Sequence, residues 1–220
     1  MDASGKGGIV RHVFSQGDPM GIHYHGFGKS TAEELDHDFL WRVKRELPKP
    51  GWIAVFDRSH YEDVVMPHVY GTYPEDVWRA RYDQINDFER ELAASGCAIL
   101  KIFLVVSQEE QKKHFLGRLD DPTKFWKFDI SDLEARDRWD EYMFAWQEVF
   151  EKTSTAAAPW YLVPADNRWY SRAVVSELLR TTLKNMNMTC PPLEPEVDPD
   201  EVRRRLACAI LPLAEPSAWH

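Results

Sequence analysis

Apolar residues in this chain follow two spacings, one typical of buried strands and the other of helices with a single buried face. Two nearly continuous apolar runs stand out, WIAVF at residues 52–56 and AILKIFLVV at residues 98–106. Such runs are typical of parallel strands that are covered on both faces. Shorter apolar stretches predict two further strands, at residues 22–27 and 160–163.

The remaining apolar residues recur mostly at helical spacing. They predict helices at residues 5–16, 31–47, 74–95, 107–117, 132–152 and 167–185. The second of these has the clearest boundaries, because Thr31 and Glu34 form a capping-box pattern at its start and Pro48 stops it. Strands that alternate with helices predict an α/β fold with a parallel sheet flanked by helices.

The composition is that of an ordinary soluble globular protein, since 44% of the 220 residues are hydrophobic and 29% are charged. No apolar run is long enough to span a bilayer, so we expect no membrane partner. The first residues lack the apolar stretch of a secretory signal. The three cysteines show no metal-like spacing, and a reduced cytoplasmic protein is the simplest interpretation.

The formal net charge of −9 argues against nonspecific binding to nucleic acid, which requires a broad basic surface. It does not exclude a phosphate-rich ligand, because phosphate sites are built from local groups. Residues 191–201 hold five acids, four prolines and no base. We therefore predict one domain at residues 1–187, followed at residues 188–220 by an acidic, proline-rich linker and a C-terminal tail.

The first candidate site is the string Asp2-Ala3-Ser4-Gly5-Lys6-Gly7-Gly8, which leads into the first predicted helix. Backbone amides of such a turn can hold phosphate oxygens, and the lysine can neutralise their charge. The string departs from the usual phosphate-binding loop in two ways. Gly7 replaces the Ser or Thr that would hold Mg²⁺, and the first glycine of the pattern would fall before Met1. From these residues alone, a flexible glycine-rich terminus is an equally good interpretation.

The second candidate site is Asp57-Arg58, directly after the apolar run at residues 52–56. α/β proteins place ligand-binding groups at the carboxyl ends of their strands. An aspartate there can hold Mg²⁺, and the neighbouring arginine can stabilise a phosphoryl group in transfer. The alternative is structural, with Asp57 capping the next helix and Arg58 pairing with a surface acid.

The third candidate is the segment 107–130, in which bases and acids are equal in number. A solvated helix is the simpler interpretation, with Glu109 and Lys113 as a favourable i,i+4 pair. We also expect structural roles for four histidines without metal-like spacing: His12, His23, His25 and His68. Three aromatic residues recur at helical spacing, which favours packing over ligand stacking: Trp139, Tyr142 and Trp146.

Seven strings stand in order along the chain: MDASGKGG, AEELDHDFLWR, FDRSHYEDV, RYDQINDFE, ILKIFLVVSQEEQ, FLGRLDDPTKFWKF and APWYLVPADNRWYSR. In their order and spacing, from Met1 to about Leu183, they resemble the polyphosphate kinase 2 family, in which GKGG is usual. The resemblance implies a P-loop kinase fold related to thymidylate kinase, with a helical lid at about residues 107–152. It also implies reversible, Mg²⁺-dependent phosphoryl transfer between inorganic polyphosphate and a nucleotide.

The resemblance assigns roles by position in these strings. It implies phosphate binding in the first string by Gly5, Lys6, Gly7 and Gly8. It implies that Asp2 and Asp57 organise Mg²⁺ and the acceptor phosphate, and that Arg58 contacts the transferring phosphoryl group. Further phosphate-binding positions are implied at Lys29, Lys113, Arg118 and Lys124. Glu34, Asp38 and Arg42 belong to a strongly patterned helix of the family, where they either bind or brace.

The chain departs from the family at the lid and at its start. Val105 and Val106 stand where a histidine is common, and His114 stands where an arginine is common, which weakens the positive charge near the lid. Family members also carry an N-terminal segment, a first strand and the first loop glycine before the position of Met1. We therefore expect the native chain to start upstream, which intact-mass analysis of the native protein would test.

We expect a homo-oligomer, a dimer or a tetramer, whose nucleotide substrate is ADP or GDP or, alternatively, a nucleoside monophosphate. Two other functions remain open from the sequence. One is an ATP-dependent nucleotide kinase of the thymidylate kinase type, which the strings DDPTKFWK and APWYLVPAD argue against. The other is a non-catalytic relative that binds polyphosphate or nucleotide.

Overall fold

The computed structural model of the chain describes residues 3–190 and 198–208. The chain divides into two compact units, with the boundary between Met186 and Asn187. The first unit contains the strands and the helices that cover them. In the second unit the structure describes one helix, α10 (Pro199–Cys208), so the end of the stretch predicted as a linker is helical. No helix of the described residues is long and apolar enough to cross a membrane.

The four strands of the first unit lie where the sequence predicts them. They are β1 (Ile22–Gly26), β2 (Ile53–Asp57), β3 (Lys101–Val105) and β4 (Trp160–Pro164). β1 pairs with β2 and β3 pairs with β4, both in parallel. The prediction of one sheet is wrong for the described residues, which form two separate two-stranded sheets. The reason is that an apolar pattern specifies which faces of a strand are covered but not which strand pairs with its edge.

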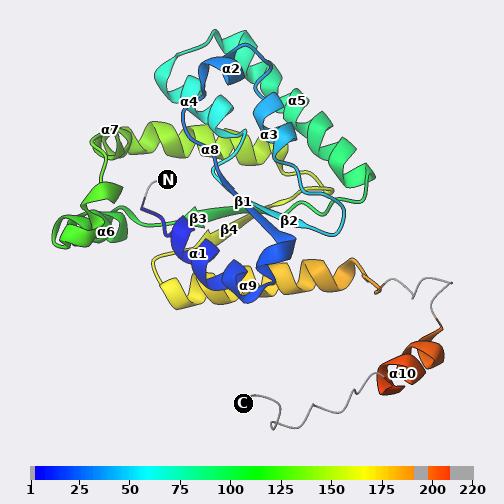
Figure 1. Cartoon of the computed structure of the whole chain (residues 1–220). Helices are drawn as coiled ribbons and strands as arrows, with labels where there is room; N and C mark the ends of the chain where they lie inside the picture. The colour runs from blue at the N-terminus through cyan, green and yellow to red at the C-terminus, as the bar shows by residue number, and fades with distance from the viewer. Residues whose placement is uncertain (1–2, 191–197, 209–220) are drawn as a thin grey trace, which may run out of the picture. The chain divides into compact units, whose positions relative to one another are not determined.

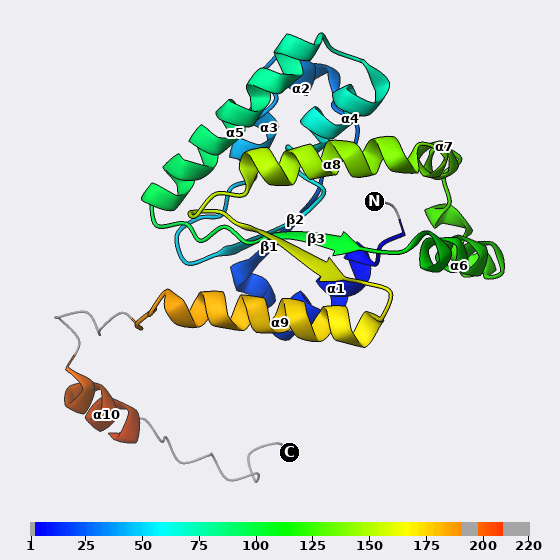
Figure 2. The same ribbon diagram turned by 180° about the vertical axis from the view of Figure 1, so that it is seen from behind.

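Helices cover the strands on two sides (Figures 1 and 2). One side carries α1 (Lys6–Val13) and α9 (Arg168–Asn185), and the other carries α4 (Glu62–Tyr70), α5 (Glu75–Ala94) and α8 (Trp139–Thr153). Each side of the strands has its own hydrophobic core. Neighbouring residues of β3 pack alternately in one core and the other, because side chains alternate along a strand. Phe103 packs in the core with α8, whereas Leu104 packs in the core with α1 and α9. This double coverage explains the unbroken apolar run around β3.

The predicted helix at residues 31–47 is wrong in its extent. The chain forms two short helices there, α2 (Ala32–Leu35) and α3 (Trp41–Arg45). The predicted capping box of Thr31 and Glu34 is confirmed at the start of α2. The break follows from the polar sequence after Leu35, where the Asp38 carboxylate accepts a hydrogen bond from the Leu40 amide at 3.0 Å. Aspartate competes in this way with the backbone ladder of a helix.

The predicted helix at residues 132–152 is also divided, into α7 (Ser131–Asp137) and α8. The break is at Arg138, whose backbone is non-helical at φ −100° and ψ 28°. Its guanidinium donates to the Val69 carbonyl at 3.0 Å and lies over the Tyr70 ring. A tertiary contact with the end of α4 therefore sets the boundary, and the local pattern could not reveal it.

The remaining segments are short or close to prediction. α6 spans Gln108–Leu119, and the loop after it contains a 3₁₀ helix, η3 (Pro122–Lys127). Two more 3₁₀ helices follow α1, η1 (Phe14–Gln16) and η2 (Pro19–Gly21).

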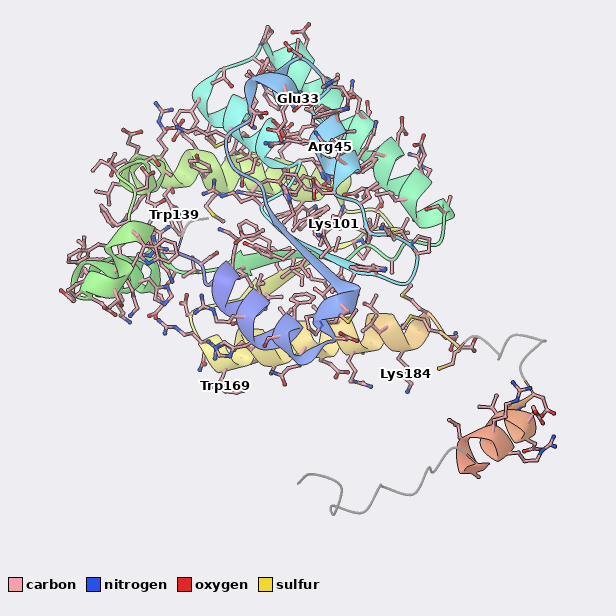
Figure 3. The ribbon with its side chains drawn as sticks, in the orientation of Figure 1. Glu33, Arg45, Lys101, Trp139, Trp169 and Lys184 are labelled. Carbon is pink, nitrogen blue, oxygen red and sulfur yellow. The ribbon has the colours of Figure 1, made fainter. Side chains whose placement is uncertain are left out.

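A buried polar network joins β3 to the helices of the α8 side. The Lys101 ammonium, inside the unit in Figure 3, donates to Glu89 Oε2 at 2.7 Å, to Tyr61 Oη at 2.9 Å and to the Thr153 carbonyl at 2.7 Å. Burial lowers the pKa of Lys101 although Glu89 opposes the shift. Burial alone would raise the pKa of Glu89, but hydrogen bonds from His60 and Lys101 leave that pKa lowered. The network ties α5, α8 and the residue before α4 to the start of β3.

Candidate functional site

The glycine turn, residues 3–8, ends in the first turn of α1. Gly5 has a left-handed φ of +96°, and its carbonyl accepts the amides of Gly8 at 2.9 Å and Ile9 at 3.1 Å. The first amides of a helix have no acceptor within the helix and point along its positive dipole end. Lys6 occupies the first helical position and is half-buried. The turn therefore provides amides and a cation for an anion, whereas Asp2 lies outside the described residues.

Asp57 is the last residue of β2 and stands in register with Gly26 of β1. Its carbonyl accepts the Phe27 amide at 3.0 Å. Burial, the charge of Asp57 and a hydrogen bond to its carboxylate together raise the pKa of Tyr24. Tyr24 therefore interacts with the Asp57 carboxylate, which the sequence did not reveal because the two residues are far apart in the chain.

Arg58 follows Asp57 with an unusual backbone. Its φ is +64°, and its side chain is exposed. The left-handed region is uncommon for a residue with a Cβ atom and costs about 1 kcal/mol or more. Such outliers cluster at functional sites, where the surrounding structure holds them in place.

The helix α6 reaches the glycine turn. Because a carbonyl oxygen only accepts, the His114 Nδ1–H donates to the Ala3 carbonyl, at 2.7 Å. The start of α6 is fixed just after the carboxyl end of β4, where the Ser107 amide donates to Asp166 Oδ1 at 2.7 Å. The departure from the family at His114 thus has a structural consequence, since this side chain joins α6 to the turn.

Three predicted phosphate-binding cations lie in α6 and η3. Lys113 and Lys124 are exposed and pair with nearby acids, Lys113 with Glu110 at 3.0 Å and Lys124 with Asp121 at 2.6 Å. Lys124, together with Thr123, lowers the pKa of Asp121 to about 2. Exposed pairs of this kind are weak, so both lysines can exchange their partner for a ligand phosphate.

Arg118 differs from these two lysines because its side chain is mostly buried, at 19% exposure. Its guanidinium donates to Asp132 at 3.0 Å and to the Lys127 carbonyl at 2.8 Å. In this conformation Arg118 braces α6 against α7 and η3.

Lys29 is exposed on the loop after β1, and the buried Arg42 side chain contacts the same loop. The Arg42 guanidinium donates to the Gly28 carbonyl at 3.0 Å and to Asp63 Oδ2 at 3.1 Å. In this structure Arg42 therefore braces the loop through these two contacts. Glu34 and Asp38 also make structural contacts, since Glu34 caps α2 and Asp38 accepts a hydrogen bond from the Leu40 amide.

Arg172 of α9 is a further cation near the glycine turn, and the sequence analysis did not single it out. Its Nη2 lies 3.8 Å from the position that a Cβ atom on Gly8 would occupy. The only sequence signal is its place at the end of the string APWYLVPADNRWYSR. The first turn of α1 thus has a guanidinium beside it as well as the ammonium of Lys6.

A hollow of about 460 Å³ lies elsewhere, along α8 and β4. Its lining consists of Asp140, Met143, Phe144, Gln147, Phe150 and Leu162. It contains no basic side chain, so it offers nothing that would hold a phosphate chain.

Comparison with known proteins connects this geometry to a family. Residues 1–191 match the family model described as Polyphosphate kinase 2 (PPK2). The AMP/ADP-polyphosphate phosphotransferase of Meiothermus ruber is 44% identical over 202 residues, which span 92% of this chain and 75% of that protein. The ADP-polyphosphate phosphotransferase of Rhodopseudomonas palustris is 41% identical over 207 residues, which span 89% of this chain and 72% of that protein.

A solved structure is similar as well. The crystal structure of Polyphosphate Kinase 2 from Arthrobacter aurescens TC1 superposes with a TM-score of 0.90 at 44% sequence identity. The match covers 95% of this chain and 73% of that chain.

Proposed function

The chain belongs to the polyphosphate kinase 2 family, and we propose that the glycine turn, the end of β2 and helix α6 together form its phosphotransferase site. The protein is an enzyme that transfers phosphoryl groups between inorganic polyphosphate and a nucleotide. The observation that carries the choice of site is the His114–Ala3 hydrogen bond at 2.7 Å. It brings the lid segment to the turn whose amides can bind an anion.

The first unit is proposed to have the P-loop kinase fold, with residues 107–152 as the lid. Two features support this proposal, a glycine turn that opens a helix and an aspartate at the carboxyl end of the parallel strand β2. Ligands of open α/β folds bind at the carboxyl ends of strands. Residues 1–187 would then be the catalytic domain.

Phosphate oxygens are proposed to bind the glycine turn. The amides at the start of α1 donate to them, and the helix dipole favours their negative charge. Lys6 and Arg172 neutralise the charge from two elements, and Lys29 adds a third cation from the loop after β1. Gly7 and Gly8 let the phosphate approach the backbone, because no Cβ atom stands in the way.

Mg²⁺ fits the donor set at the end of β2. Asp57 supplies carboxylate oxygens, the ligand type that Mg²⁺ prefers, and Mg²⁺ commonly takes one or two carboxylates together with substrate phosphates. Asp57 would hold the ion, with Asp2 as the second carboxylate. When bound, the ion supplies positive charge that offsets the charge of the phosphates. Tyr24 orients the Asp57 carboxylate through its hydrogen bond.

The reaction moves one phosphoryl group. An oxygen of the terminal nucleotide phosphate forms a bond to the end phosphorus of polyphosphate, and the P–O bond to the rest of the chain breaks. Arg58 contacts the group in transfer, while Lys113 and Lys124 hold the polyphosphate chain. Closing the lid excludes water, which limits hydrolysis. The acceptor is ADP or GDP, with a nucleoside monophosphate as the alternative. The enzyme is proposed to act in both directions and as a homo-oligomer.

A coupled assay tests the proposal on this chain, with polyphosphate, Mg²⁺ and either ADP or GDP. Nucleoside triphosphate should form, and Lys6→Ala should lower kcat/KM by about 10²-fold or more because it removes charge stabilisation in the transition state. Lys49→Ala, a change of an exposed lysine before β2, is the matched control and should have little effect. Equal formation of GTP from GDP with ATP in place of polyphosphate, or full activity of a folded Lys6→Ala variant, would contradict the proposal.

A further inference from the structure

Two histidines of β1 and one glutamate of α3 come together outside the proposed phosphotransferase site. His23 and His25 are two residues apart on a strand, so both side chains point to the same face. Glu46 follows the last residue of α3 and lies opposite them. We call these three residues the His-His-Glu cluster. Spacing along the chain does not connect Glu46 to the two histidines, since it is 23 residues from His23.

The ligand atoms of the cluster converge on one point. His23 Nε2 lies 2.8 Å from Glu46 Oε2, and His25 Nδ1 lies 3.2 Å from the same oxygen. One nitrogen from each ring and one carboxylate oxygen all lie within 4.8 Å of one another. We propose that the His-His-Glu cluster binds one divalent transition-metal ion of the zinc type.

The spacing of these atoms suits such an ion. Zinc binds imidazole nitrogen and carboxylate oxygen at about 2.0–2.2 Å, which places neighbouring ligand atoms roughly 3.3 Å apart in a tetrahedral site. The two distances to Glu46 Oε2, 2.8 and 3.2 Å, are close to this value, and the two histidine nitrogens lie within 4.8 Å of each other. His23, His25 and Glu46 are 43%, 32% and 25% exposed. An ion can therefore enter from solvent, and water can fill its remaining coordination position.

The donor set also selects the class of metal. Two imidazoles with one carboxylate favour zinc, cobalt, nickel or copper, whereas Mg²⁺ prefers oxygen ligands throughout. The cluster is thus distinct in chemistry from the Mg²⁺ site proposed at Asp57. Tyr24, which bonds Asp57, lies between the two histidines on the strand and points to the opposite face. Neither histidine nor Glu46 has a part in the proposed phosphoryl transfer.

Neighbouring groups prepare the cluster for a cation. Glu46 Oε2 lies beside both imidazoles, so one carboxylate and two ring nitrogens are already close together before any ion binds. The His25 ring packs against the buried Phe27 ring, with centroids 4.4 Å apart. This ring contact limits the rotation of the His25 side chain.

A metal ion here would fasten the end of α3 to β1. The chain between His25 and Glu46 contains Lys29, α2 and α3. An ion that joins the two ends of this segment would therefore restrict its motion. Because the ligands are assembled only in the folded chain, binding would raise the stability of the fold.

The test uses the untagged full chain, stripped of metal with a chelator, and Zn²⁺ alone as the probe. Equilibrium dialysis followed by elemental analysis should find one bound Zn²⁺ per chain, which excess Mg²⁺ does not displace. Zn²⁺ should also raise Tm in a thermal unfolding scan. Replacing Zn²⁺ by Co²⁺ should give the visible absorption of a four-coordinate site.

Variants assign the binding to the cluster. His23→Gln and Glu46→Gln keep a hydrogen-bonding side chain but remove a metal ligand. We expect each to weaken Zn²⁺ binding at least about tenfold and to abolish the rise in Tm, since even outer-shell changes cost that much. His12→Gln, a change of an exposed histidine on α1, is the matched control and should bind Zn²⁺ normally.

Two outcomes would overturn the proposal. One is that the unchanged chain binds no Zn²⁺, which would show that the three side chains form hydrogen bonds only. The other is Zn²⁺ binding that the cluster variants do not change, which would place the ion elsewhere. Polyphosphate and nucleotide are omitted throughout, so failure of the proposed phosphotransferase activity would not affect either result.

Discussion

At the scale of single residues, Gly5 decides the conformation of the glycine turn. Its φ of +96° lies in the region that side chains with a Cβ atom rarely adopt. Gly5→Ala should therefore destabilise the turn by about 1–2 kcal/mol and lower kcat/KM, because the amides of α1 would move away from the phosphate. Chemical unfolding and the coupled assay measure the two effects.

Gly117→Ala is the matched change for the stability measurement. Gly117 lies inside α6, where an added Cβ atom would meet nothing within 4 Å. Alanine favours a helix more than glycine does, so stability should stay the same or rise by up to about 1 kcal/mol. Equal losses in both variants would show that the positive φ of Gly5 is not the cause.

At the scale of elements, two arginines of α3 make ion pairs that should differ strongly in their contribution to the free energy of unfolding. Arg42 is 7% exposed and holds Asp63 at 3.1 Å, whereas Arg45 is 56% exposed and lies 3.7 Å from Glu33 on α2 (Figure 3). Arg42→Ala should cost about 3 kcal/mol in urea unfolding, because it leaves a mostly buried carboxylate unpaired. Arg45→Ala should cost less than about 0.5 kcal/mol. Similar losses would contradict the assignment of Arg42 as the brace of the Lys29 loop.

The network around Lys101 predicts a pH dependence. Glu89→Gln leaves a buried ammonium without its counter-charge and should cost about 3–5 kcal/mol at pH 7. In the variant the pKa of Lys101 falls further below its unfolded value. The unfolded chain then binds more protons than the folded chain in the range between the two pKa values, so stability rises with pH there.

The decrease in the free energy of unfolding that Glu89→Gln causes should consequently become smaller as the pH rises from 7 toward the ordinary lysine pKa of about 10.4. Urea unfolding of both proteins at several pH values measures this difference. Glu91→Gln, at an exposed position of the same helix, should show no such trend. A loss that is constant over this range would argue that Lys101 does not titrate.

At the scale of the whole molecule, the first unit contains both hydrophobic cores. A chain of residues 1–187 should therefore fold alone, with Tm within a few degrees and activity within about threefold of the full chain. A chain of residues 1–174 should not fold stably, because it loses Val175, which is fully buried at 0% exposure, and the partly buried Leu178 and Leu179. If residues 1–187 fold but lose activity, the C-terminal unit takes part in function.

The same scale shows why the site was only partly predictable. Gly5, Lys6 and Asp57 can be proposed from the sequence because each lies in a local pattern, a glycine turn before a helix or a polar residue after an apolar strand. Tyr24, His114 and Arg172 were missed because their partners lie on other elements, and a linear pattern carries no signal for such contacts. The roles of Lys113, Arg118 and Lys124 in holding polyphosphate stay predictions.

The sequence by itself determined the positions of the four strands, the capping box at Thr31 and the family, because these depend on local periodicity and on ordered strings. Tertiary structure alone decided that β2 and β3 belong to separate sheets, that Arg138 divides α7 from α8, and that Arg42 braces a loop. It also brought Glu46 to His23 and His25, a contact that no spacing along the chain reveals. The physical reason is the same in each case. Burial of a face can be read from one segment, whereas a hydrogen bond or ion pair requires a partner that only folding brings within reach.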